Sequence, residues 1–257
     1  MDSKKRAFEL DALRGLALFL MVLHHTAYDL RYIFDLNILA FQERDYFWAF
    51  IQPFFVCVFV VISGICCQFS RSNPKRALKL LVFSVILTTS TVIVDRFFID
   101  GVAIYFNIIH LLTVGTALFA LFDWWEQKSQ NSGNKRVGNA VLLLLALTFL
   151  FLVDGFDYYD GMVETKLLIP FGIQSRNFVE MGDYLPMVPW LGVFIIGVLL
   201  GRFCYEKKET FFPNAPSVLK KITKPFEFIG RHSLLVYLIH QPIVLGILYL
   251  LRLGGII

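Results

Sequence analysis

The 257-residue sequence is poor in charged residues, which make up only 17% of it. A soluble domain carries about 25%, so this composition excludes an ordinary soluble protein. Hydrophobic residues reach 57% and the mean hydropathy is +0.64, values typical of an integral membrane protein. The formal net charge of +4 is too small to suggest a nucleic-acid-binding protein.

Cysteine and metal-binding patterns are also scarce. The sequence has four cysteines, and their spacing fits neither a zinc site nor the disulfide framework of a secreted domain. We interpret them as packing residues. The histidines lack a His-x-x-x-His spacing and an acidic partner set, so we expect no metal. No period of about 20 to 50 residues repeats, which argues against a solenoid.

Long apolar stretches, in contrast, are abundant. A membrane-spanning helix needs about 20 mainly apolar residues, and seven stretches qualify: 9–29, 46–69, 77–95, 104–123, 139–155, 187–205 and 233–251. No small-residue cleavage site follows the first stretch, so we expect a retained span rather than a signal peptide. The sequence therefore predicts an all-α polytopic membrane helix bundle of about seven transmembrane helices, forming one domain over residues 1–257.

Lysine and arginine are distributed unevenly over the predicted loops. If the N-terminus is cytoplasmic, all but six of the 24 Lys and Arg residues lie on the inner side; the six are Arg31, Arg44, Arg96, Lys166, Arg176 and Arg252. Cytoplasmic loops are enriched in these residues, so we predict a cytoplasmic N-terminus. The inner segment KKETFFPNAPSVLKKITKPFEF mixes Lys with apolar residues, which is typical of an interfacial helix.

The first span carries ionisable residues at both ends. Such groups cost roughly 2.5–3.5 kcal/mol each at the centre of a bilayer, so they usually face a protein interior or a wet cavity. At 100° per residue, Asp11, Arg14, His25 and Asp29 share one stripe, and His24 lies off it. We predict His25 and Asp29 as catalytic residues, because a carboxylate one turn away could fix the tautomer of the imidazole. A structural, hydrogen-bonded role is favoured for His24.

Two further predicted spans carry an imidazole. Tyr237 and His240 lie about 60° apart around the last span, and Asn107 precedes His110 by three residues. Pro242 removes a backbone hydrogen bond and is expected to kink its helix. Three helices that each present a histidine suggest a shared polar chamber. The residues expected to line it are His24, Asn107, His110, Tyr237 and His240.

The spacing of Arg14 and His25 suggests the shape of a ligand. Eleven residues of helix separate them by about 17 Å at a rise of ~1.5 Å per residue. A long ligand that is anionic at its inner end and reactive at its outer end would fit this corridor. Acyl-coenzyme A has that shape.

Several segments resemble one known family. DALRGLALFLMVLHH at residues 11–25 resembles the opening of the heparan-α-glucosaminide N-acetyltransferase family and its bacterial membrane relatives. It is more loosely similar to acyltransferase family 3, which shares an Arg-Gly followed by a histidine eleven positions after the Arg. Further matching segments follow in the same order: PFFVCVFVVISG (53–64), NIIHLLTVG (107–115), GDYLPMVPWLGVFIIGVLLG (182–201) and GRHSLLVYLIHQP (230–242).

The resemblance implies a multi-pass acetyltransferase of a bacterial inner membrane. Its donor would be acetyl-CoA on the cytoplasmic side, and its acceptor a sugar-like molecule or glycolipid near the outer side. His25 would be the catalytic histidine, and Asp11 and Arg14 would form or position the donor site. Because the lysosomal enzyme of the family has additional spans, a homodimer that completes the donor cavity is compatible with the resemblance.

Other functions and mechanisms stay open at this point. A transporter of a small polar or anionic solute also lines its path with intramembrane His and Arg. A retinal pump is excluded, because no Lys occurs between Ser233 and Leu251. A structural scaffold would tolerate loss of His25. For the acyltransferase, His25 could act as general base or could itself be acylated.

Overall fold

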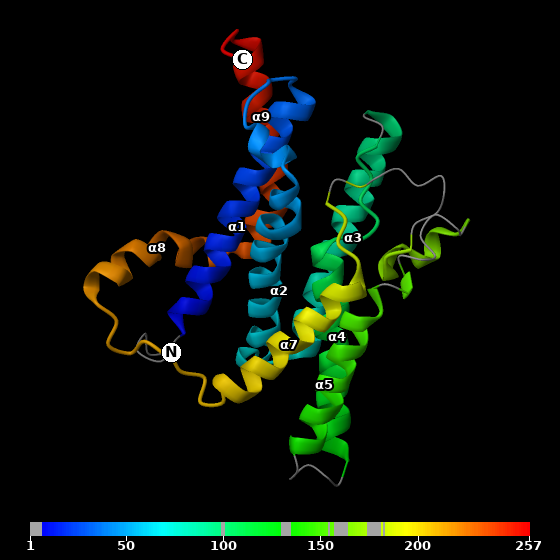
Figure 1. The fold of residues 1–257 in the computed structure, drawn as a ribbon, viewed down its shortest axis with the longest axis vertical. Helices are drawn as coiled ribbons and strands as arrows, with labels where there is room; N and C mark the ends of the chain where they lie inside the picture. Colours follow the sequence, from blue (N-terminus) through cyan, green and yellow to red (C-terminus); the bar gives the residue numbers. More distant parts are fainter. Residues whose placement is uncertain are drawn as a thin grey trace. The chain divides into compact units, whose positions relative to one another are not determined.

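The protein is all-helical in the computed structural model, which describes residues 7–98, 101–129, 135–153, 155–156, 164–173, 181 and 183–257. Over these ranges no strand occurs, and the predicted all-α class is confirmed. The long helices are α1 (Phe8–Tyr28), α2 (Gln52–Phe69), α3 (Asn73–Phe97), α4 (Ile108–Lys128), α5 (Lys135–Phe151), α7 (Met187–Cys204), α8 (Ser217–Arg231) and α9 (Ser233–Leu253) (Figure 1). The short ones are η2 (Asp29–Ile33), η3 (Ala40–Glu43), η4 (Phe47–Ile51) and η5 (Lys166–Phe171).

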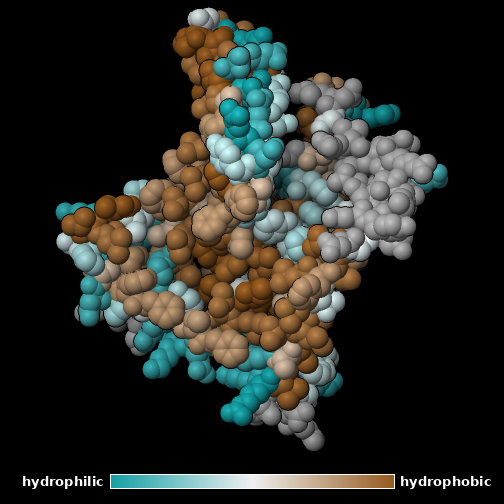
Figure 2. Space-filling view, in the orientation of Figure 1, coloured by the Kyte–Doolittle hydropathy of each residue, from teal (hydrophilic) through white to brown (hydrophobic). Residues whose placement is uncertain are grey.

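Six helices among the described residues are long and apolar enough to cross a membrane. They are 8–33, 47–69, 73–97, 108–128, 187–204 and 233–253. The seventh expected span corresponds to α5, which is shorter, with 17 residues, and is not among these six. Large apolar side chains are exposed along the helices, as at Phe54 and Leu250, both 70% exposed, and hydrophobic residues cover much of the face in Figure 2. The protein is an integral membrane protein; its exact span count and cytoplasmic N-terminus stay predictions.

The chain forms two compact units. The first unit combines both ends of the chain, Met1–Ile62 and Lys207–Ile257, and the second is Ser63–Glu206. The boundary between Ile62 and Ser63 lies within α2. The single domain expected over residues 1–257 stays a prediction.

In the first unit, α8 packs directly against α1 through two glycines. A Cβ at Gly15 would lie 1.8 Å from the backbone oxygen of Phe226, and a Cβ at Gly230 would lie 1.9 Å from that of Asp11. The Phe19 and Phe226 rings meet edge to face with centroids 5.9 Å apart. Gly15 of the Arg-Gly pair therefore has a packing role, because only glycine allows this approach. The expected interfacial helix is α8, which keeps apolar side chains such as that of Ile222 exposed.

In the second unit, small residues bring α7 close to its neighbours. A Cβ at Gly192 would lie 2.7 Å from the backbone oxygen of Ala146 in α5, and one at Gly201 would lie 3.0 Å from that of Ile65 in α2. Phe194, fully buried, lies between them on α7. Helix α3 joins α4 through a hydrogen bond of 2.9 Å between the Ser84 and Thr113 hydroxyls.

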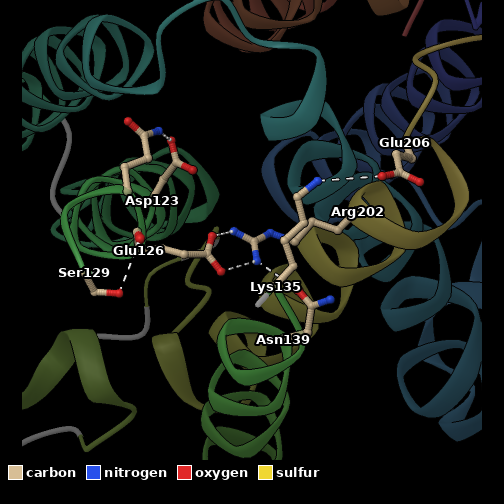
Figure 3. Close-up of polar contacts among 8 residues, drawn as sticks. Asp123, Glu126, Ser129, Lys135, Asn139, Arg202 and Glu206 are labelled. Carbon is tan, nitrogen blue, oxygen red and sulfur yellow. Dashed lines mark hydrogen bonds and ion pairs between the residues drawn. The ribbon is translucent and has the colours of Figure 1, made fainter. Parts of the chain in front are cut away.

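A charged cluster joins the ends of α4, α5 and α7 in the same unit (Figure 3). The Arg202 guanidinium binds the Glu126 carboxylate with both Nη atoms, at 3.2 and 2.6 Å, and donates to Asn139 Oδ1 at 2.9 Å. It also lies over the Phe119 and Phe122 rings, 5.5 Å from each centroid. A two-pronged pair of this kind fixes both side chains. This cluster therefore fastens three helix ends.

Candidate active site

The polar stripe of α1 ends at a buried carboxylate. Asp29 is 1% exposed and begins η2, a π-helical turn that continues α1. Its two carboxylate oxygens each accept a hydrogen bond of 2.9 Å from Gln241 Nε2 on α9. Within the described part of the chain, Gln241 rather than His25 is therefore the hydrogen-bond partner of Asp29. Single turns of π-helix occur frequently at functional sites.

His25 and His240 contact each other across α1 and α9. Their ring centroids lie 5.2 Å apart with the planes inclined at 64°. His240 Nδ1 lies 2.6 Å from the Tyr237 backbone oxygen, and a carbonyl oxygen only accepts hydrogen bonds, so Nδ1 carries the proton. In the neutral form of His240 the lone pair is then on Nε2, a buried atom without a hydrogen-bond partner in the described ranges. The site thus contains an imidazole nitrogen without a hydrogen-bond partner in the described ranges, on the ring that contacts His25.

His24 is held by a glutamine of the following loop. Gln42 Nε2 donates to the His24 backbone oxygen at 3.1 Å and lies 3.0 Å from His24 Nδ1. The His24 ring also contacts Phe47 and Trp48, with centroids 5.2 and 5.6 Å away. These contacts show that His24 is hydrogen-bonded, while the structural role expected for it stays a prediction.

The N-terminal end of the stripe is enclosed by α8 and the segment before it. The buried Asp11 carboxylate lies 3.5 Å from Nε of Arg231. Glu9, also buried, accepts hydrogen bonds from the Thr210 hydroxyl at 2.6 Å and the Phe211 amide at 3.0 Å. Arg14 is partly buried one turn after Asp11. The predicted donor end of the stripe is thus built from both termini of the chain.

Asn107 and His110 belong to the second unit, where they begin α4. Asn107 caps the helix by accepting from the Ile109 amide at 3.1 Å and donates to Asp183 Oδ2 at 3.2 Å. His110 Nδ1 lies 2.8 Å from Asn107 Oδ1, and its Nε2 lies 3.0 Å from the Thr88 hydroxyl. Both ring nitrogens of His110 are therefore engaged inside this unit. Their place in a chamber shared with His25 stays a prediction.

The structure brings most of the predicted site residues into the first unit. They are Asp11, Arg14, His24, His25, Asp29, Tyr237 and His240. Sequence reasoning missed Gln42, Gln241 and Arg231 as their hydrogen-bonding or ionic partners. Gln241 directly follows His240 and could have been noticed there, but Gln42 lies in a loop without any periodic signal.

In the described parts of the chain, no group of three or more His, Cys, Asp or Glu residues could hold a metal ion.

These features define a class: an integral membrane protein that buries carboxylates and paired imidazoles between its helices. A family model described as heparan-alpha-glucosaminide N-acetyltransferase, catalytic, matches residues 6–242. The chain therefore belongs to the heparan-alpha-glucosaminide N-acetyltransferase family, and the resemblance seen in the sequence is confirmed. This membership indicates a membrane acetyltransferase. No curated protein and no solved structure matches the chain.

Proposed function

We propose that this protein transfers an acetyl group from acetyl-CoA to an amine or hydroxyl of a sugar-like or glycolipid acceptor. The donor binds from the cytoplasmic side of a bacterial inner membrane, and the acceptor binds near the outer side. The proposal depends above all on the contact between His25 and His240 in the first unit, where the rings lie 5.2 Å apart between two helices of a family acetyltransferase. A buried, neutral imidazole is the usual general base of acyl transfer near neutral pH.

His25 takes the proton of the acceptor as the acceptor nitrogen or oxygen attacks the thioester carbon. The carbon–sulfur bond breaks, and the coenzyme A thiolate leaves and takes up the proton. The charge that develops on His25 is stabilised by Asp29, which lies one turn further along the same stripe. Gln241 supports this role, since its amide fixes the Asp29 carboxylate from α9.

At the other end of the stripe, Arg14 binds the phosphate-bearing part of acetyl-CoA. Eleven helical residues place it about 17 Å from His25, a separation suited to a long donor. The ion pair between Asp11 and Arg231 fastens α8 beside this end. Through this ion pair, Asp11 positions the donor site.

The proposal is tested by supplying purified protein with labelled acetyl-CoA and an amino sugar, and measuring coenzyme A release and labelled product. We expect turnover by the natural protein and its loss in His25→Ala. His232→Ala is the matched control, because His232 is exposed in the same unit and should keep its activity. Label retained on the denatured protein but absent from His25→Ala would indicate an acetyl-imidazole intermediate.

A transporter is the alternative that the same residues suggest. Solute uptake into proteoliposomes, with no coenzyme A release under any condition, would refute the enzymatic proposal. The acceptor can be identified by comparing the masses of lipid extracts from cells with and without the protein. The expected difference is the mass of one acetyl group.

A further inference from the structure

Gln42 is the one residue of the η3 loop that the described structure buries. It is 2% exposed, whereas Leu39 and Phe41 beside it are 41% and 45% exposed. The loop thus exposes the apolar side chains of Leu39 and Phe41 and buries the amide of Gln42. Burying an amide costs free energy unless the amide forms hydrogen bonds. Gln42 forms two, both from Nε2 to His24, whereas its Oε1 is buried without a partner among the described residues.

The two hydrogen bonds define the protonation of His24. The His24 backbone oxygen can only accept, so the atom of Gln42 that faces it, 3.1 Å away, is the amide nitrogen. The same nitrogen lies 3.0 Å from His24 Nδ1, which must then accept as well. His24 consequently carries its proton on Nε2, and an additional proton on Nδ1 would face the Gln42 N–H group.

His24 in turn lies against His25. Their ring centroids are 5.5 Å apart and the rings meet edge to face at 78°. A positive charge on His24 would oppose the proton that His25 must accept as a base. A neutral His24 with a fixed ring orientation therefore favours the chemistry proposed for His25.

The loop has a separate anchor that does not involve Gln42. Arg31 Nε and Nη2 bind Glu43 at 2.8 and 2.5 Å, and Arg31 Nη1 donates to the Ile38 backbone oxygen at 2.9 Å. The loop is thus fastened on both sides of Gln42. The two bonds from Gln42 to His24 are directed at the histidine itself.

We infer that Gln42 is a positioning residue of the acetyltransferase site: it holds His24 as the neutral Nε2–H imidazole beside His25. This inference rests on the proposed function. Gln42 acts from the outer loop through His24, so its loss should affect the acetyl-transfer step and leave donor binding unchanged.

The test compares Gln42→Met, which keeps the shape without a donor, with Gln42→Glu, which accepts a proton from Nδ1. We expect both to lower kcat roughly 10- to 100-fold, the size of the effect when metal-ligating histidines lose an orienting partner, with little change in the KM for acetyl-CoA. In a His24→Ala background the Gln42→Met effect should vanish, because the two residues act as one unit. Glu43→Gln is the control that weakens the loop anchor and should keep kcat.

Histidine labelled with ¹⁵N provides a second readout on the folded protein. The His24 Nδ1 signal should be that of an unprotonated nitrogen in the natural protein and of a protonated one in Gln42→Glu. If the natural protein turns over, either of two results overturns this inference alone: full kcat in both Gln42 variants, or a protonated His24 Nδ1 in the natural protein. Absence of turnover by the natural protein overturns the proposed function and this inference together.

Discussion

The contact between α1 and α8 predicts that one methyl group at Gly15 destabilises the protein. The Cβ of an alanine there would lie 1.8 Å from the Phe226 oxygen, and ordinary contact begins at 3.4 Å, so the helices must separate by about 1.6 Å. Because the opposing atoms belong to the backbone, no rotamer change relieves the clash. Overpacking costs up to about 3 kcal/mol, and alanine recovers about 1 kcal/mol of helix propensity.

The expected net loss for Gly15→Ala is therefore about 2 kcal/mol, or a melting temperature lower by about 4–8 °C for a chain of this size. The assay is thermal unfolding of the purified protein in detergent. Gly246→Ala in α9 is the matched control, since nothing lies within 4 Å of its Cβ, and it should be stabilised by about 0.5–1 kcal/mol. Equal melting temperatures for the two variants would refute the proposed close approach of α1 and α8.

Two further substitutions test the polar contacts of each unit. Arg202→Met leaves the Glu126 carboxylate without its ion pair and should lower the free energy of unfolding by about 1–3 kcal/mol. The double variant with Glu126→Gln should recover most of the lost melting temperature. No recovery would contradict a paired role. Asp29→Asn keeps a partner for Gln241 but removes the negative charge near His25. It should lower kcat roughly 10²-fold with the KM for acetyl-CoA unchanged, and a change confined to KM would place Asp29 in the donor site instead.

Helical periodicity predicted the stripe of α1 well but missed the partners of its residues. Asp11, Arg14, His25 and Asp29 lie on one helix, so their relative order follows from 3.6 residues per turn. The partner of Asp29 is Gln241, 212 positions away, and such pairing depends on tertiary contacts. The register itself changes at Asp29, because η2 is a π-helix there.

The start of the fourth predicted span was wrong by a few residues for a local reason. The sequence predicted 104–123, whereas α4 is Ile108–Lys128. Asn107 caps the helix and His110, three residues later, completes a capping box. This signal was present in the sequence, but the histidine was interpreted as a candidate site residue. Helix α9 continues through Pro242, and the kink expected there stays a prediction.

The three imidazoles of the first unit differ in what they can still bind. His24 is engaged through Nδ1 by Gln42, and His240 is engaged through Nδ1 by the Tyr237 oxygen. Within the described residues the ring of His25 forms no hydrogen bond, so it can accept a proton without breaking one. At an effective dielectric constant of about 20, two unit charges at the 5.2 Å between the His25 and His240 rings repel by about 3 kcal/mol. In the proposed reaction, a second proton on this pair would therefore be disfavoured while His25 holds the proton of the acceptor.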